Sequence, residues 1–252
     1  MKKTIQIVLH ALASCALLAG CGGGSEPGEM RVTMDLGRDV SEWRGGYADY
    51  SEQTAPEDVV IAGAPVPAPA TGTALYMAGR NRSDDLFLFA KRRWVGLVPN
   101  THYQLTFSVT FLTNAPTGCV GVGGGPDSVW LKAGGSATEP AAIKLDTDIV
   151  MNIDKGIQSE GGANAVVLGD IGNTSTDCAN PRFESKTLTS SQPVVATTDS
   201  DGALWFFIGI DSGFESATAV YLRSVDVNIK QSDQAPGEAV APVKEGGSRR
   251  LL

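Results

Sequence analysis

The sequence predicts an all-β domain, built as a two-sheet β-sandwich in a single folded unit. Three observations favour this. The 252 residues include 30 glycines, and short apolar runs are separated by turn-forming Gly, Ser, Thr, Asn and Asp. Long helical periodicity is missing after the first twenty residues. About ten strand signals recur within roughly 200 residues, which is typical of a sandwich. No linker interrupts them, so we expect one domain over residues 31–230.

Three segments give the clearest strands. Residues 103–111 place apolar side chains at odd positions and polar ones at even positions, directly after the Pro99-Asn100 turn. Residues 204–210 are apolar on both faces, as in a central strand covered on both sides. Residues 225–230 alternate again and give a last strand with one wet face. Weaker strand signals lie near residues 32–36, 59–62, 74–78, 86–89, 120–122, 129–132, 143–145, 165–168 and 194–197.

The first residues predict an export signal over residues 1–20. Lys2 and Lys3 precede an apolar stretch over residues 5–18, too short to cross a bilayer comfortably, which takes about 20 residues. The segment Leu18-Ala19-Gly20-Cys21 resembles the lipobox of bacterial lipoproteins. That resemblance implies cleavage after Gly20, a diacylglyceryl group on the Cys21 sulfur, and a further acyl chain such as palmitate on the new amino terminus. An ordinary secretory signal with a chance cysteine remains the alternative.

The flanking segments and the charge complete the domain organisation. We expect residues 21–30 to be a flexible tether and residues 231–252 to be a disordered tail, because both are polar and lack periodicity. The net charge of −8 does not suit nucleic acid or anionic lipid, so the acyl chains would supply the attachment. The lipobox resemblance implies a cell-envelope protein, and Gly22 after the cysteine implies the outer membrane in a Gram-negative host.

Two cysteines remain for pairing. Cys15 lies in the signal and Cys21 is consumed by lipid, which leaves Cys119 and Cys178. In an oxidising compartment this even pair predicts a disulfide. The alternative, two thiolate metal ligands, has no histidine nearby to complete it.

Two segments carry a resemblance to a known class of domain. Residues 96–107, with Pro99, Thr101 and Tyr103 at the entry to a long strand, resemble a segment of jelly-roll carbohydrate-binding modules and galactose-binding-like domains. Residues 224–229 resemble the final strand of those domains, where an aspartate lies among alternating valines. The resemblance covers under a tenth of the chain; it implies a jelly-roll-like sandwich and a glycan partner.

The sequence lacks the motifs of the common hydrolases. His102 is the one histidine left after signal removal, and neither Gly-x-Ser-x-Gly nor His-Glu-x-x-His occurs. The glycines of residues 121–125 lack the Lys-Ser/Thr of a phosphate-binding loop and favour a strand followed by a turn. Catalysis is therefore not favoured. A polysaccharide-active enzyme that uses loop carboxylates stays open, because sequence cannot place two loops relative to each other.

Candidate ligand-binding residues combine aromatic faces with hydrogen-bonding groups. Sugar sites use exposed aromatic rings beside amides and carboxylates. Such sets occur around residues 43–50 and 81–94, and the alternative for their aromatic members is a place in the core. The candidates are Trp43, Tyr47, Arg82, Asp84, Asp85 and Trp94.

Acidic residues in predicted turns raise the question of calcium. Calcium binds six to eight oxygen ligands, and the candidates here are Asp154, Asp211 and Glu215. No cofactor is required by the sequence, and Asp in turns also bonds its own backbone. The sequence favours a lipid-anchored envelope protein whose non-catalytic β-sandwich binds glycan or serves a structural role. An assembly factor that binds an envelope protein is a further alternative.

Overall fold

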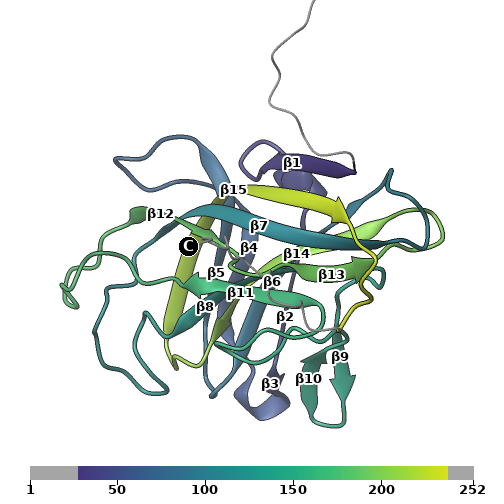
Figure 1. Cartoon of the computed structure of the whole chain (residues 1–252). Coiled ribbons are helices and arrows are strands. Elements are labelled where there is room, and N and C mark those ends of the chain that lie inside the picture. The colour runs from purple at the N-terminus through teal and green to yellow at the C-terminus, as the bar shows by residue number, and fades with distance from the viewer. Residues whose placement is uncertain (1–27, 238–252) are drawn as a thin grey trace, which may run out of the picture.

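The structure is a computed structural model that describes residues 28–237 (Figure 1). Two single-turn 3-10 helices, Val40–Glu42 and Glu52–Thr54, interrupt an otherwise all-β chain. The strands are β1 (Glu29–Asp35), β2 (Arg44–Ala48), β3 (Tyr50–Ser51), β4 (Glu57–Pro65), β5 (Thr73–Arg80), β6 (Leu86–Trp94), β7 (His102–Thr113), β8 (Val129–Ser136), β9 (Ala142–Leu145), β10 (Asp148–Met151), β11 (Ala165–Asp170), β12 (Glu184–Thr189), β13 (Val194–Thr197), β14 (Leu204–Ser212) and β15 (Ala217–Gln231).

Two antiparallel sheets form the sandwich, as the sequence predicts. Sheet A has the order β12-β7-β15-β5-β4, with β13 also pairing with β7 and β1 also pairing with β15. Sheet B has the order β11-β8-β14-β6-β2. A small third sheet, β3-β10-β9, lies at one end (Figure 1). No helix in the described residues is long and apolar enough to cross a membrane.

The core lies between the two sheets and follows from strand alternation. On β7, Leu105, Phe107 and Val109 point inward with 1 % exposure or less, while the residues between them stay partly exposed. On sheet B, Phe206 and Ile208 of β14 face them. The alternation that predicts a strand at residues 103–111 therefore also identifies its buried face.

The outer face of sheet B is covered as well. Phe87, Phe89 and Phe207 are buried there, and Met151 and Ile153 of the segment after β9 pack against them. This second cluster explains why residues 204–210 are apolar on both faces. Residues 152–164 therefore lie over the centre of the outer face of sheet B.

Several boundaries differ from the prediction. Residues 120–122 are not a strand: Val120 is 98 % exposed in a loop, and Gly121 and Gly124 directly after it form an isolated local bridge. Four strands are missed: β2 and β12, since glycine and polar residues hide their alternation, and β3 and β10, which are only two and four residues long. The tether ends earlier than expected, because β1 already begins at Glu29.

The predicted disordered tail also begins too early, because its first residues are ordered. The first residues of the expected tail pack on the sheet edge, since Ser232 N donates to His102 O at 2.9 Å and Gln104 Nε2 to Gln234 Oε1 at 3.1 Å. The signal segment, Gly20, Cys21 and residues 238–252 lie outside the described residues.

Candidate functional site

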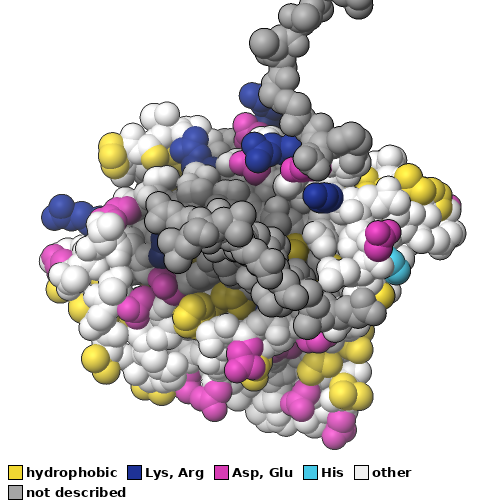
Figure 2. Space-filling view, in the orientation of Figure 1, with side chains coloured by type: hydrophobic (Ala, Val, Ile, Leu, Met, Phe, Trp, Pro, Cys, Tyr) yellow, Lys and Arg dark blue, Asp and Glu magenta, His cyan; other side chains and the backbone are white. Residues whose placement is uncertain are grey.

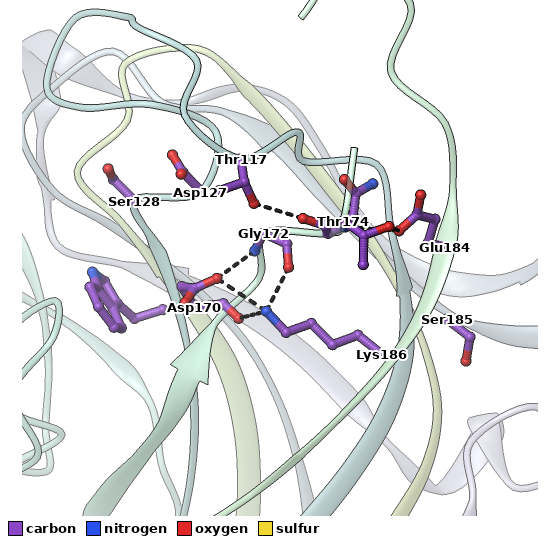
Figure 3. Close-up of a pocket in the computed structure, with 11 residues that line it drawn as sticks. Thr117, Asp127, Ser128, Asp170, Gly172, Thr174, Glu184, Ser185 and Lys186 are labelled. Atoms are coloured by element: carbon purple, nitrogen blue, oxygen red, sulfur yellow. Dashed lines mark hydrogen bonds and ion pairs between the residues drawn. The ribbon is translucent and has the colours of Figure 1, made fainter. Parts of the chain in front are cut away.

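A pocket of about 540 Å³ opens at one end of the sandwich, between the loop that joins β7 to β8 and the loop that joins β11 to β12 (Figure 3). The first loop contributes residues 117–128 and the second residues 172–174, while strand ends supply the floor. The lining residues are Thr117, Asp127, Ser128, Trp130, Asp170, Gly172, Asn173, Thr174, Glu184, Ser185 and Lys186.

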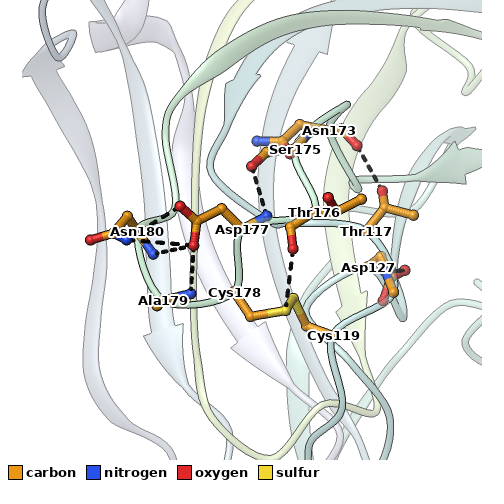
Figure 4. Close-up of a disulfide and its surroundings, with 11 residues drawn as sticks. Thr117, Cys119, Asp127, Asn173, Ser175, Thr176, Asp177, Cys178, Ala179 and Asn180 are labelled. Carbon is orange, nitrogen blue, oxygen red and sulfur yellow. Dashed lines mark hydrogen bonds between the residues drawn. A yellow bond between two sulfur atoms is a disulfide. The ribbon is translucent and has the colours of Figure 1, made fainter.

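A disulfide joins the two loops and confirms the predicted pairing. Cys119 and Cys178 are bonded, with their Cα atoms 5.8 Å apart (Figure 4). Beside it, Thr117 N donates to Ser175 O at 2.8 Å, and Thr117 Oγ1 donates to Asn173 O at 2.7 Å. The pocket walls are therefore connected by a covalent bond and by hydrogen bonds, which restricts their movement before any ligand arrives.

The Asn173 side chain fixes the inner end of the second loop. Its Nδ2 donates to Thr113 O at 3.2 Å and to Arg182 O at 2.8 Å, and its Oδ1 accepts from Ser175 N at 3.0 Å. Asn173 is only 8 % exposed. A buried amide with these partners holds one loop conformation, because any other would leave polar groups unpaired.

Lys186 crosses the pocket from β12 to the end of β11 (Figure 3). Its Nζ donates to Gly172 O at 2.6 Å, to Asp170 O at 2.8 Å and to Asp170 Oδ1 at 3.1 Å. The same Oδ1 accepts from Gly172 N at 2.8 Å. These bonds fix the positions of the ammonium group and of the Asp170 carboxylate.

Two more carboxylates are held by one oxygen each. Glu184 Oε2 accepts from Thr174 Oγ1 at 2.7 Å and from Thr174 N at 2.9 Å, and these bonds lower the pKa of Glu184. Asp127 Oδ2 accepts from Gly118 N at 2.9 Å. Within residues 28–237, the other oxygen of each carboxylate carries no hydrogen bond, so it can accept one from a ligand.

Trp130 supplies the aromatic part of the lining. It is partly buried on β8 and is paired with Asp170 of β11 across the sheet. An indole offers an apolar face to a sugar ring and an N–H to one of its hydroxyls. With three carboxylates and one ammonium group, the lining is acidic, which suits a neutral hydroxyl-rich ligand and disfavours an acidic one. On the face shown in Figure 2, acidic side chains spread widely while basic ones lie mainly in its upper half.

The structure places the predicted tryptophans away from any ligand. Trp43 is 6 % exposed and belongs to the core, and Trp94 packs against that core with its ring 6.3 Å from Phe206. The burial of Trp43 speaks against a role in sugar binding, while Trp94 is partly buried and lines neither of the two pockets described here. Arg82 is exposed and forms an ion pair with Glu57 at 3.3 Å.

The remaining predicted residues lie around a second pocket of about 410 Å³. Asp84 and Asp85 line it together with Asp49 and Tyr50. Tyr47 is 38 % exposed and stacks on Tyr50 with ring centroids 5.5 Å apart. The structure therefore brings Tyr47, Asp84 and Asp85 to one region, as a smaller and more acidic alternative to the first pocket.

Two of the three predicted calcium ligands, Asp211 and Asp154, have other partners. Asp211 is completely buried and contacts the ammonium groups of Lys132 and Lys155, which leaves no place for a cation. Asp154 accepts from Gly156 N at 3.0 Å and Ala163 N at 2.9 Å, as a turn residue does. In the part of the chain that the structure describes, no group of three acidic, histidine or cysteine side chains could hold a metal, Glu215 included.

The lining residues of the first pocket were missed at the sequence level. Trp130, Glu184 and Lys186 belong to strands far apart along the chain, and none stands in a recognisable motif. The predicted disulfide was the one available signal. Linking Cys119 to Cys178 brings the segments beside them together, and those segments contain the pocket.

The fold and this pocket define an antiparallel β-sandwich with a disulfide-linked, polar loop site at one end. No protein-family model matches the sequence, and no curated protein is significantly similar to it. Solved structures with a similar fold include a carbohydrate-binding module that recognises mannan (11 % identity, TM-score 0.39, covering 81 % of this chain and 99 % of that one). Others are an adhesin domain of Lys-gingipain from Porphyromonas gingivalis (10 %, TM-score 0.38, 80 % and 99 %) and a family 11 carbohydrate-binding module from Clostridium thermocellum (12 %, TM-score 0.37, 81 % and 95 %). Likeness at this level does not extend to function, so the pocket itself must indicate the ligand.

Proposed function

We propose that this chain is a lipid-anchored cell-envelope protein whose β-sandwich binds a neutral glycan without cleaving it. The site is the pocket between the two disulfide-linked loops. One observation carries the proposal. The indole of Trp130, three carboxylates and the ammonium group of Lys186 line a single pocket, and a disulfide connects the two loops that form its walls.

The chemistry of a sugar ring matches this lining. Its hydroxyls donate to carboxylate oxygens, while its C–H face packs on an aromatic ring. The free oxygens of Asp127 and Glu184 are acceptors, and the ammonium of Lys186 is already oriented by Asp170. A site whose groups are ordered in advance loses less entropy when the ligand binds.

Binding without hydrolysis is supported by the state of Glu184. A glycosidase needs a carboxylic acid with a raised pKa to protonate the leaving oxygen. The two bonds from Thr174 lower the pKa of Glu184, so this group stays ionised and accepts hydrogen bonds.

The envelope location is supported by the sequence alone. Lys2, Lys3, the apolar stretch and the Leu18–Cys21 segment have the arrangement of a lipoprotein signal. One acyl chain binds a membrane only marginally, whereas two or three chains together hold almost permanently. Glycans of the envelope or its surroundings would then be within reach of the pocket.

A glycan array probed with the chain lacking residues 1–21 tests the proposal. We expect binding to neutral oligosaccharides, unchanged when calcium is chelated, and at least a tenfold loss of affinity in Trp130→Ala. Tyr47→Ala is the matched aromatic control from the second pocket and should bind as the parent does. Absence of binding to every glycan would contradict the proposal and favour a protein partner. Loss of binding in Tyr47→Ala alone would move the site to the second pocket.

A further inference from the structure

Five ionisable side chains gather beneath the 152–164 segment on the outer face of sheet B. Lys132 comes from β8 and Asp211 from the adjacent strand β14. Asp85 precedes β6, Asp49 follows β2, and Lys155 comes from the covering segment. None of these groups belongs to the wall of the glycan pocket described above, so a separate role must explain them.

Lys132 and Asp211 form a fully buried pair. Lys132 Nζ lies 2.7 Å from Asp211 Oδ2, and both side chains have 0 % exposure. The rest of the Lys132 ammonium is satisfied by two carbonyls, Lys155 O at 3.1 Å and Glu160 O at 2.9 Å. The lysine nitrogen is thus held against one carboxyl group in a place that water does not reach.

Lys155 has a carboxylate of its own. Its Nζ lies 2.7 Å from Asp211 Oδ2 and 2.7 Å from Asp49 Oδ2. Its pKa is raised by these two carboxylates although burial opposes the shift, so Lys155 stays charged. Burial lowers the pKa of Lys132, which makes Lys132 the lysine that more readily gives up its proton.

Asp85 completes the arrangement. Asp85 Oδ1 and Asp211 Oδ1 are both buried, and among the described atoms neither has a hydrogen-bond donor. The two carboxyl groups interact, and one proton held by Asp85 would satisfy both oxygens. Burial, followed by the charge of Asp211, raises the pKa of Asp85 to about 8, so this carboxyl carries that proton at neutral pH.

We propose that Lys132 and Asp211 condense into an intramolecular amide, an isopeptide bond between β8 and β14, with Asp85 as the group that relays protons. The geometry supports this proposal. The buried Lys132 nitrogen lies 2.7 Å from the buried Asp211 carboxyl group, and the Asp85 carboxyl group contacts that of Asp211.

The reaction balances without any other reagent. A proton passes from the Lys132 ammonium to the Asp211 carboxylate, which gives an amine and a carboxylic acid. The amine nitrogen attacks Cγ of Asp211, the new C–N bond forms, and the C–Oδ2 bond breaks. Oδ2 leaves as one water molecule, and Asp85 transfers the remaining proton from nitrogen to the departing oxygen. Nothing is oxidised or reduced.

The surroundings favour the condensed state. The rings of Phe87, Phe89 and Phe207 are buried on the same face of sheet B, and Phe87 lies 4.9 Å from Lys155 Nζ. Burial favours the neutral amine and acid, although the charges of Lys132 and Lys155 lower the pKa of Asp211, and burial excludes water that would reverse the reaction. Reacting atoms held on the order of 3–3.5 Å apart gain most from such positioning.

The product also leaves no charge unpaired. Loss of Lys132 and Asp211 as ions removes one positive and one negative charge, and Lys155 remains paired with Asp49. Asp211 Oδ1 becomes the amide carbonyl oxygen and can accept the proton of Asp85. The bond would tie two central strands of sheet B that are distant in sequence.

Peptide mass spectrometry of the full chain, held at neutral pH and then reduced and digested with trypsin, tests the bond. Trypsin does not cut after an acylated lysine. We therefore expect no cleavage after Lys132, and a branched peptide linking the Lys132 segment to the Asp211 segment, lighter than their sum by one water. Complete cleavage after Lys132 with an unlinked Asp211 peptide would overturn the proposal.

Three variants separate the bond from a structural ion pair. Lys132→Arg keeps the charge but should abolish the branched peptide. Asp85→Asn keeps the size and a hydrogen-bond donor, so it should fold and still lose the bond for lack of a proton relay. Lys186→Arg, in the separate ion pair with Asp170, is the matched control and should keep the bond. A branched peptide joined through Lys155, or one that persists in Asp85→Asn, would contradict the assignment.

Discussion

Burying an ammonium group costs several kcal/mol unless its partners compensate. Lys132 meets this requirement with the carboxylate of Asp211 and two backbone carbonyls, and Lys155 with Asp211 and Asp49. The five ionisable groups are neutral as a set only if Asp85 keeps its proton. The raised pKa of Asp85 therefore follows from the charges around it as well as from its burial.

Asp85→Asn should change how stability depends on pH. The ordinary pKa of the group is 3.8, and in the fold it is about 8. A raised pKa means that the folded state binds the proton more tightly, so this contribution to stability is full below the lower value and is lost as pH rises through the higher one. The melting temperature of the parent should fall as the pH rises from about 4 to about 8, whereas the Asn variant should show a flatter profile there. Parallel profiles for the two proteins would contradict the protonated state of Asp85.

Single-residue roles were only partly predictable from the sequence. Trp43 and Trp94 could be recognised as aromatic, but their burial depends on which face of a strand or turn meets the core. From the sequence, Asp211 was expected in a turn, and Lys132 stands at the end of a weak strand signal with no sign that it is buried. They are buried because the 152–164 segment covers that face, and a long covering loop has no periodic signal in the sequence.

At the scale of elements, strands with one apolar face were predicted well and polar or glycine-rich ones were not. β7 and β15 lie where period-two alternation indicates them. β12 was missed because its serine, lysine and threonine residues bury little surface, although it pairs with β7 along its whole length. Residues 120–122 show the reverse error, since β-branched residues between glycines form a loop.

The disulfide acts at this scale too, because it connects two loops and no strands. Replacing Cys119 and Cys178 together by serine should lower the free energy of unfolding by about 4 kcal/mol in the chain-entropy model, since the pair closes a long loop. Chemical denaturation of the parent and the double variant measures this. The loops would also lose their covalent connection, so glycan affinity should fall. Unchanged affinity would mean that the hydrogen bonds of Asn173 and Thr117 suffice to form the pocket.

At the scale of the whole molecule, the pocket lies between the loops that join β7 to β8 and β11 to β12. The described chain begins at β1, which lies beside β15 (Figure 1). The composition and the paired cysteines predicted the sandwich and the covalent link between its loops. They did not predict the pocket, because its lining comes from β8, β11 and β12 and from two loops. Such a site exists only after the strands are ordered in space.

The proposed membrane attachment is tested by removing the Cys21 sulfur, which is the proposed site of the lipid. Cys21→Ala should move the protein from the membrane fraction to the soluble fraction of cells, since the acidic body has no electrostatic attraction to anionic lipid. Metabolic labelling with a fatty-acid analogue should mark the parent and leave the variant unlabelled. A variant that still pellets with membranes would contradict the anchor.

The most direct test of the proposed binding site is a nuclear magnetic resonance titration of the chain lacking residues 1–21 with a neutral oligosaccharide. We predict that the indole N–H of Trp130 and the backbone amides of Gly172, Thr174 and Lys186 shift progressively as the sugar is added. Amides around Tyr50 and Asp84 should stay in place. Shifts confined to that second pocket, or none at saturating sugar, would contradict the account.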